Sequence, residues 1–529
     1  MPADLASDND RFPYFEPDQQ IVLERLKRDI AAEFELCGFV PLETPCVEPK
    51  AVLDIDASLD EQTYALIRAP GERKVREAIK RAGEFLGSEV VPDFIDDYAE
   101  VAAVGIAPGD RVEAKILKIV AYLEKLSETG LALHSDLTLP LAHFVAENES
   151  VAPDKRLVFP FRRYQIQKVW RASTLVAPLR REIEEFYQCD IDVIGRGRLA
   201  LLTDAEIPGV IYRVFRNMQI GKFVISIGNS QVSNAYLRHR GIGRSHGDGT
   251  PDQRSALQDA GKIINQRRAK GTRWAVEQLA EVSGISSEDA WKTIAFLDEP
   301  YVSSAHTCER LTSLGDDRLS EAAHELCKVV DDIKLFGVPD DYVWINPCMS
   351  RGLGYYTGTT YETHLVDHPG IGSICHGGRY DDLTTKFHTK ERYPGVGISI
   401  NLTPLFKRLL AAELVRVGRA TTASVLVLTD YTDRAQISES ISLAQSLRRV
   451  GINTEIFLEN EAIQEQIRYA NLKGFAVAII VPSASSGEVD VKIKNLVAGG
   501  LVSCPRADVV TTAKDLLKTL AGARGAASR

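Results

Sequence analysis

The apolar positions of residues 18–38 recur at the spacing of one helix face. They are Val22, Leu26, Ile30, Phe34 and Cys37. Glycine readily adopts the left-handed conformation that ends many helices, so the pattern predicts an amphipathic helix that ends at Gly38. The following residues, FVPLETPCVEP, alternate apolar and polar positions around Pro45. Proline lacks the N–H that a central strand needs, so this segment is expected to form an edge or interface strand.

The region up to residue 402 mixes strand-like and helical patterns. Residues 131–236 and 342–402 alternate in the manner of strands separated by polar loops, and 404–418 have the pattern of a basic helical connector. Two further segments, at about 57–128 and 240–330, have helical spacing and many charges. We predict a first domain over 1–416 with an antiparallel sheet that these two helical insertions interrupt.

The tail has a different organisation. Its apolar runs VLVLTD, TEIFLE and FAVAIIVP are strand-sized, and helical segments stand between them. Alternating strands and helices are typical of an α/β module with a parallel or mixed sheet. Residues 420–529 are therefore predicted to form a second domain, and the whole chain an α+β protein.

Composition and charge exclude several classes of protein. Hydrophobic residues make up 44% of the 529 residues and charged residues 26%, which is typical of globular domains and not of disordered or fibrous chains. The formal net charge of −10 excludes a basic coat for nucleic acid over the whole surface. It does not exclude a local positive groove, because steering depends on where the charges lie.

The N-terminal residues and the cysteines indicate the cellular compartment of the protein. MPADLASDND is polar and acidic, and no apolar run is long enough to span a membrane. The eight cysteines are scattered, with no CxxC pair and no histidine cluster at ligand spacing. We predict a cytoplasmic protein with reduced thiols, no disulfide framework, no structural zinc and no membrane partner.

Two strand-like segments carry the first candidate chemistry. In FRRYQIQKVWR, strand alternation places Arg163 and Arg171 on one face, as either an anion clamp or a solvated basic strand. EEFYQCDIDV follows with Gln188, Asp190 and Asp192 at alternating positions. Paired in a hairpin, the two segments would make a polar floor for a small zwitterion and a phosphate.

Two glycine-rich loops carry further arginines and tyrosines. SRGLGYYTGTTYE contains Arg351, Tyr355 and Tyr356, and CHGGRYDDL contains Arg379 and Tyr380. An arginine beside tyrosines can bind phosphate and hydrogen-bond a heteroaromatic side chain. Each tyrosine could equally be a core residue with a satisfied hydroxyl.

In this order, HSDLTLPLA, RYQIQKVWRA, EEFYQCDIDVIG, SRGLGYYTGTTYE, GGRYDDL and PGVGISI closely resemble the motifs of histidyl-tRNA synthetases. These enzymes are class II aminoacyl-tRNA synthetases, and the tail resembles their anticodon-binding domain. The resemblance implies an antiparallel catalytic sheet and a homodimer formed partly near Pro45. It also implies ATP with Mg²⁺ as a substrate, L-histidine and tRNA(His) as partners, and a reaction through histidyl-adenylate.

The resemblance assigns roles to individual residues. Asp136, with Leu137 and Thr138, matches the segment that holds the α-amino group of histidine. The other expected histidine-binding residues are Gln188, Asp192, Tyr355 and Tyr356. Arg171 and Arg351 match the two arginines that act on the α-phosphate of ATP, where charge develops.

The ATP side departs from the usual pattern. An acidic residue is replaced by Ser173, Glu182 and Glu184 stand where arginines are expected, Gly354 replaces an aspartate, and Pro404 replaces an arginine. A charge pair at ~5 Å with an effective dielectric of about 20 is worth ~3 kcal/mol, so one reversal could cost on the order of 6. Two arrangements would avoid this cost. Arg180 and Arg181 could take the positions of the missing arginines, or Glu182 and Glu184 could hold Mg²⁺.

Two functions remain open from the sequence. The first is a histidine-tRNA ligase that uses ATP to form histidyl-adenylate and transfers histidine to tRNA(His). The second is a histidine-binding relative with lost or altered ATP use, which would be a regulatory protein or a biosynthetic amino-acid-activating enzyme. The departures at the ATP side keep the second hypothesis open.

Overall fold

The computed structural model describes residues 14–53, 64–67, 128–173, 182–243, 251–299, 301–349, 355–430, 434–482 and 489–527. The chain divides into two compact units. The first comprises the described part of Ile30–Ala411, and the second comprises the described residues after it together with those before Ile30. Each unit has its own sheet.

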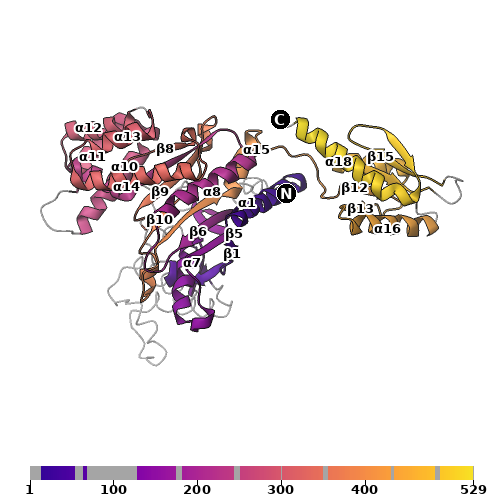
Figure 1. Ribbon diagram of the computed structural model, residues 1–529, viewed down its shortest axis with the longest axis horizontal. Coiled ribbons are helices and arrows are strands. Elements are labelled where there is room, and N and C mark those ends of the chain that lie inside the picture. Colours follow the sequence, from indigo (N-terminus) through magenta and orange to yellow (C-terminus); the bar gives the residue numbers. More distant parts are fainter. Residues whose placement is uncertain are drawn as a thin grey trace, which may run out of the picture. The chain divides into compact units, whose positions relative to one another are not determined.

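An eight-stranded sheet forms the centre of the first unit (Figure 1). In spatial order its strands are β1 (Val40–Pro41), β5 (Phe161–Ser173), β6 (Glu182–Ile194), β11 (Gly395–Asn401), β10 (Ser373–Tyr380), β9 (Thr359–Leu365), β7 (Phe223–Asn229) and β8 (Val343–Ile345). Only the two edge pairs, β1 with β5 and β7 with β8, are parallel. The predicted α+β fold with a large antiparallel sheet is confirmed.

The described helices before residue 412 begin and end largely where the sequence indicates. The helix predicted to end at Gly38 is α1 (Pro17–Leu36), and Gly38 has the left-handed φ of 77°. The connector predicted at 404–418 is helical only as far as Ala411, in α15. The other described helices of this region, outside the second predicted insertion, are α2 (Lys50–Leu53), α7 (Thr138–Glu147), α8 (Leu202–Met218), α9 (Ser230–His239) and α15 (Leu402–Ala411).

The segment around Pro45 forms two strands at the edges of two different sheets, so the predicted edge position is confirmed, although the segment is not a single strand. β1 pairs with β5 at the edge of the large sheet. β2 (Val47–Pro49) instead pairs with β4 (Glu128–Leu133), which also pairs with β3 (Tyr64–Ile67). Pro45 lies between the two strands and cannot donate to a ladder, which accounts for the break.

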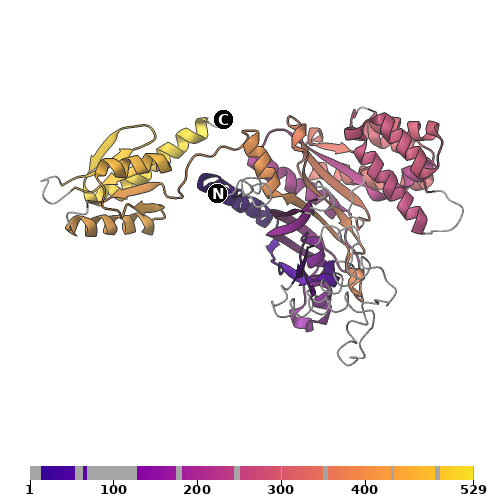
Figure 2. The same ribbon diagram turned by 180° about the vertical axis from the view of Figure 1, so that it is seen from behind.

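Five helices follow one another in the second predicted insertion. They are α10 (Pro251–Lys270), α11 (Thr272–Ser283), α12 (Ser287–Asp298), α13 (Ser304–Thr312) and α14 (Asp317–Leu335). Figure 2 shows them gathered at the β8 end of the sheet. Of the first predicted insertion, 64–67 form strand β3 and 128 begins β4, and the remainder lies outside the described residues.

The prediction that no cysteines are paired is wrong. Cys308 in α13 and Cys327 in α14 form a disulfide, with their Cα atoms 6.0 Å apart. The two residues are 19 positions apart, and the packing of α13 against α14 brings them together. The sequence gives no sign of this pairing because it depends on helix packing rather than on cysteine spacing.

The second unit has three layers around a five-stranded mixed sheet. The strand order is β13 (Thr454–Ile456), β12 (Val425–Leu428), β14 (Val477–Ile480), β15 (Val491–Asn495) and β16 (Leu501–Cys504). Val425 and Val427 face a core that includes residues of α16 (Arg434–Arg449) and α18 (Val509–Ala527). Leu426 and Leu428 face the opposite side, where α17 (Ile463–Lys473) packs. The predicted alternation of strands and helices is present.

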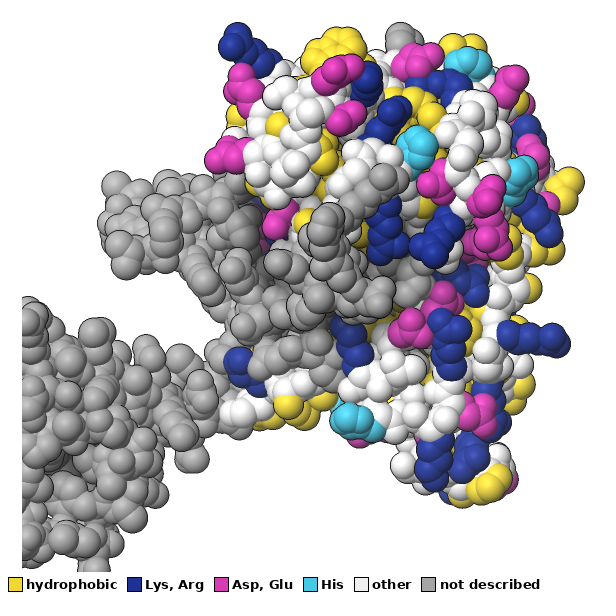
Figure 3. All heavy atoms as spheres, turned by 90° about the vertical axis from the view of Figure 1, so that its left-hand side faces the viewer, with side chains coloured by type: hydrophobic (Ala, Val, Ile, Leu, Met, Phe, Trp, Pro, Cys, Tyr) yellow, Lys and Arg dark blue, Asp and Glu magenta, His cyan; other side chains and the backbone are white. Residues whose placement is uncertain are grey.

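Acidic and basic side chains are interspersed on the face shown in Figure 3. No single sign dominates the coloured part of that face, in agreement with a chain that is not globally basic. No helix among the described residues is long and apolar enough to cross a membrane.

Candidate functional site

The β5–β6 hairpin forms the predicted polar floor. Opposite residues of an antiparallel pair point to the same face of a sheet. The opposed pairs on this face are Arg163 with Asp192, Gln165 with Asp190, Gln167 with Gln188, and Arg171 with Glu184. Two separate segments of the chain therefore present polar side chains on one face, interrupted by the apolar pair Val169 and Phe186 before Arg171.

Arg171 lies at the meeting point of three predicted site segments. Its Nε donates to the carbonyl oxygen of Ser135 at 2.8 Å, and its Nη2 donates to Oε1 of Gln188 at 3.3 Å. The guanidinium carbon is 5.1 Å from the ring centroid of Phe186, within the range of a cation–π contact. The structure thus brings Arg171 and Gln188 together, as the sequence predicts.

Asp136 is buried at the start of α7. Its Oδ1 accepts hydrogen bonds from the backbone N–H groups of Thr138 (3.1 Å) and Leu139 (3.0 Å). Burial raises the pKa of Asp136, while these N–H groups and the charge of Arg171 act in the opposite direction. Leu137 lies between the two predicted polar residues, and its side chain packs in a buried apolar cluster with Phe186.

Asp192 and Asp190 are fully buried on β6. The hydroxyl of Tyr380 donates to Oδ1 of Asp192 at 2.7 Å, and Arg163 pairs with its Oδ2 at 2.8 Å. Burial raises the pKa of Asp192 to about 6 and that of Asp190 to about 8, and the charge of Arg163 opposes both shifts. Arg163 is therefore bound inside the site and is neither of the alternatives considered from the sequence, a free anion clamp or a solvated basic strand.

Tyr355 and Tyr356 form the aromatic wall of the site. Their ring centroids are 4.7 Å apart, and Tyr355 also meets Tyr380 edge-on at 6.2 Å. The hydroxyl of Tyr355 is hydrogen-bonded to Thr138, so the aromatic pair touches the segment that carries Asp136. Of the residues predicted in this loop, Arg351 and Gly354 lie outside the described residues.

Three glycines leave room for these side chains. A Cβ on Gly397 would lie 2.0 Å from Oδ1 of Asp192, and one on Gly395 would lie 2.3 Å from the ring of Tyr380. A Cβ on Gly378 would lie 2.8 Å from the ring of Tyr356. Neither these glycines nor Tyr380 is among the site residues that the sequence predicts. The Gly-Arg-Tyr motif is the sequence signal that could have indicated Tyr380 as a site residue. The positions of the glycines beside these side chains depend on strand register, which the sequence does not show.

The predicted ATP side lies at the end of the hairpin where residues 174–181 connect β5 to β6. Glu184 is exposed, while Ser173 and Glu182 are opposed in the strand pair but their side chains lie outside the described part. Pro404 is the third residue of α15, within the first turn, where a missing N–H costs no helix hydrogen bond. Thr403 accepts a hydrogen bond from the N–H of Tyr187 at 2.9 Å, which joins the start of α15 to β6.

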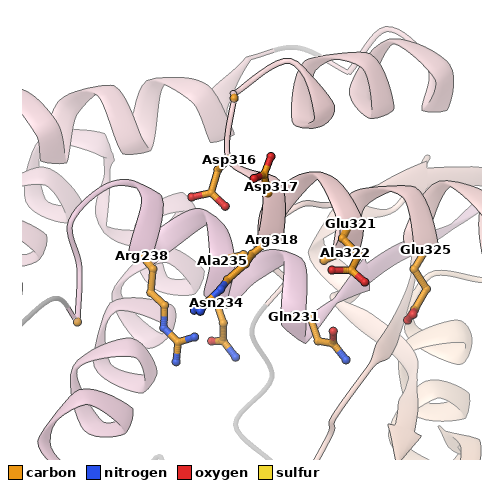
Figure 4. A pocket seen from close by; sticks show the side chains of 12 residues that line it. Gln231, Asn234, Ala235, Arg238, Asp316, Asp317, Arg318, Glu321, Ala322 and Glu325 are labelled. Atoms are coloured by element: carbon orange, nitrogen blue, oxygen red, sulfur yellow. The ribbon is translucent and has the colours of Figure 1, made fainter. Parts of the chain in front are cut away.

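A separate cavity of about 1090 Å³ lies between α9 and α14 (Figure 4). The charged residues that line it are Arg238, Arg318, Asp316, Asp317, Glu321 and Glu325. Four carboxylates oppose two guanidinium groups, so a triphosphate would meet net negative charge there. None of the predicted histidine-binding residues lines this cavity, although Gln231 at its wall donates to the carbonyl of Thr357 at 3.4 Å.

Among the described residues, no three His, Cys, Asp or Glu side chains are grouped so that they could hold a metal ion. Mg²⁺ usually keeps several waters and is held through substrate phosphates with one or two carboxylates, so it does not require such a group.

The chain resembles known proteins over almost its whole length. Residues 88–405 match the family model described as histidyl-tRNA synthetase, and 422–516 match the one described as anticodon binding domain. A histidine–tRNA ligase of Xanthomonas campestris pv. campestris is 33% identical over 502 residues, which cover 94% of this chain and 93% of that protein. One from Xylella fastidiosa (strain M12) is 32% identical over 94% of this chain and 95% of its own.

Solved structures agree with these matches. The crystal structure of histidyl-tRNA synthetase from Nostoc sp. PCC 7120 has a TM-score of 0.72 and 28% sequence identity, and covers 95% of this chain and 97% of that one. A Bacillus halodurans structure titled as an ATP phosphoribosyltransferase regulatory subunit/histidyl-tRNA synthetase shares the fold, with a TM-score of 0.59 at 18% identity over 87% and 94% of the chains. On its motifs, its family-model matches and its relatives, the chain belongs to the histidyl-tRNA synthetase family.

Proposed function

We propose that the chain is a histidine-tRNA ligase, which activates L-histidine with ATP and transfers it to tRNA(His). The observation that carries the proposal is the convergence of Asp136, Gln188, Asp192 and the tyrosine pair beside Arg171 in one buried site. The ligase names of the full-length relatives and the anticodon-binding family match of the tail support it.

Histidine recognition follows from the charges of the site. Asp136 is a buried carboxylate that can accept from the α-ammonium of histidine, and its fixed Oδ1 leaves Oδ2 with no partner among the described residues. Asp192 and Tyr356 would meet the imidazole, whose ring nitrogens need an acceptor and a donor. Gln188, held near Arg171, can contact the carboxylate end of the amino acid.

Activation requires no nucleophile from the protein. An oxygen of the histidine carboxylate attacks the α-phosphorus of ATP, a new P–O bond forms, and the bond to the bridging oxygen breaks as pyrophosphate leaves. Arg171, and Arg351 by its motif, would stabilise the negative charge that develops on the α-phosphate. In the second step a terminal ribose hydroxyl of tRNA attacks the carbonyl carbon and AMP leaves.

Two of the altered residues on the ATP side, Glu184 and Pro404, lie where they need not prevent ATP binding. Glu184 is exposed, so its charge acts through water, where a unit pair at 4 Å is worth about 1 kcal/mol rather than several. Pro404 fits the first turn of α15, and Phe186 offers a ring beside Arg171. ATP would bring Mg²⁺ on its phosphates. These features, with the family of the tail, favour the ligase over a histidine-binding relative that lacks ATP use.

We propose further that the chain acts as a homodimer in the cytoplasm, through the surface near Pro45. Apolar side chains are exposed on the strands around it, with exposed fractions of 49% for Val40 and 39% for Leu131. Exposed apolar residues grouped on one surface are typical of an interface between subunits. Sedimentation at micromolar concentration would show a particle of twice the chain mass, and a monomer would contradict the proposal.

The ligase proposal is tested by histidine-dependent exchange of labelled pyrophosphate into ATP, followed by charging of tRNA(His). The wild-type chain is expected to perform both, and Asp136→Asn to lose exchange because the partner of the ammonium loses its charge. Histidine binding without exchange would instead support the relative with lost ATP use. Exchange without charging would support a biosynthetic enzyme with another acceptor.

A further inference from the structure

Arg163 is the most deeply buried cation of the first unit's site. It lies on β5 directly opposite Asp192 of β6, and its side chain has an exposed fraction of 0%. An arginine is almost never fully buried unless it is paired, because removing its charge from water is costly. Its position inside the sheet therefore calls for a specific partner.

The guanidinium joins two separate segments of the site. Nη2 lies 2.8 Å from Oδ2 of Asp192 and also donates to the carbonyl oxygen of Leu137 at 3.0 Å. Leu137 lies between Asp136 and Thr138, whereas Asp192 belongs to the hairpin. One nitrogen thus links the segment expected at the α-ammonium of histidine to the carboxylate expected at its imidazole.

Asp192 is held from both sides. Tyr380 donates to Oδ1 at 2.7 Å while Arg163 pairs with Oδ2, and the backbone of Gly397 closes the space beside Oδ1. A carboxylate bound at both oxygens loses rotamer freedom before any substrate arrives, and such preorganisation strengthens binding. Arg163 supplies the positive charge of this arrangement.

Three carboxyl groups share the site with this one buried guanidinium. Asp136, Asp190 and Asp192 are all buried, and their burial disfavours the charged forms. The charge of Arg163 acts against burial at Asp190 and Asp192. Without it, Asp192 would bind a proton more readily and would lose its capacity as an acceptor.

We propose that Arg163 is a positioning residue for histidine. By pairing with Asp192 and donating to Leu137, it fixes the separation between the groups that meet the two ends of the amino acid. Arg163 itself touches neither the ATP nor the reacting carboxylate in this arrangement. The inference rests on the proposed function and deepens it.

The test compares Arg163→Gln and Arg163→Lys with Arg162→Gln. Arg162 is the neighbouring residue on the other face of β5, where it pairs with Glu206 at 2.7 Å, so its variant controls for loss of a strand ion pair. In pyrophosphate exchange, R163Q is expected to raise the KM for histidine by at least about 30-fold while the KM for ATP changes by less than about 2-fold. R162Q should change neither KM.

The pH profile separates positioning from a purely structural role. The groups that face Asp192 are Arg163, Tyr380, Tyr356, Asp190 and Asp136. In R163Q the acid limb of the kcat/KM profile for histidine should move to higher pH, because Asp192 loses the positive charge beside it. In R163K the acid limb should return to its wild-type pH, while the KM for histidine recovers only in part. Histidine titrates in the same range, so only the difference between variants is informative.

A folded R163Q with the wild-type KM for histidine and an unmoved acid limb would overturn the proposal. So would equal changes in both KM values. If R163Q does not fold, R163K tests the proposal through the same two measurements, the KM for histidine and the acid limb of the pH profile. Calorimetric titration of the wild type and R163K with L-histidine distinguishes the ligase proposal from the Arg163 proposal. If the wild type binds histidine but performs no exchange, the ligase proposal is refuted, and the affinities of the two proteins for histidine still test the role of Arg163. Wild type that binds no histidine would refute both.

Discussion

Replacing Gly397 by alanine tests the packing around Asp192. The added Cβ would lie 2.0 Å from Oδ1 and 2.5 Å from Cγ of Asp192, and 2.6 Å from the carbonyl oxygen of Ile191. Asp192 cannot move aside freely because Tyr380 and Arg163 hold its two oxygens. The carbonyl belongs to a paired strand and is equally fixed.

The expected cost has two parts. Overpacking a closed site costs about 1–3 kcal/mol. Displacing Asp192 from Tyr380 removes a hydrogen bond to a charged group, worth about 1.5–3 kcal/mol. Gly397→Ala should therefore lower the free energy of unfolding by about 2.5–6 kcal/mol. If half of that cost falls on histidine binding, the KM for histidine rises about 10- to 100-fold.

Urea unfolding and pyrophosphate exchange measure the two effects. The matched control is Gly370→Ala, because a Cβ at Gly370 would meet no atom within 4 Å. This control should stay within about 0.5 kcal/mol of the wild type. A G397A protein with the stability and histidine KM of G370A would refute the packing argument.

Three further predictions concern other buried groups. Burial raises the pKa of Asp190 from 3.8 to about 8, so the folded chain binds more protons than the unfolded one and the free energy of unfolding falls as pH rises between these values. Asp190→Asn should flatten that dependence in urea unfolding at pH 5 and pH 8, and an unchanged slope would contradict it. Arg379 pairs with the buried Asp204 at 2.7 Å, so Arg379→Gln leaves that carboxylate without its cationic partner and should lower the free energy of unfolding by about 3–5 kcal/mol in thermal unfolding. A decrease below about 1 kcal/mol would contradict this prediction. Thiol titration of the denatured, unreduced chain should find six of the eight cysteines free, and Cys327→Ser should cost about 3 kcal/mol, whereas eight free thiols would exclude the Cys308–Cys327 bond.

The sequence predicts the elements of the site better than their contacts. Alternation along residues 161–173 and 182–194 indicates two strands with polar faces, because the side-chain period of a strand is two residues. It does not indicate that Arg163 stands opposite Asp192, because that register depends on where the hairpin closes. The internal pairing of Arg163 was therefore missed.

Features that depend on tertiary packing were also missed. The Cys308–Cys327 bond needs α13 and α14 to lie together, and the split of the segment around Pro45 needs a second sheet to receive β2. Glu184 was given a large electrostatic cost because its exposure could not be known from the sequence. Local patterns determine element type, whereas exposure and partners follow from the assembled core.

The β5–β6 hairpin has consequences for how this enzyme can diversify. Gln188 and Asp192 are held by Arg171 and Arg163 of the facing strand and, at Asp192, by Tyr380 of β10, so the proposed selection of histidine would be built into the scaffold. The residues expected to meet the nucleotide, Arg171 and Glu184, lie at the other end of the hairpin, beside the connection between the two strands. Exchanging the intervening sequence, 174–181, between relatives should therefore retune nucleotide affinity while the preference for histidine is inherited unchanged.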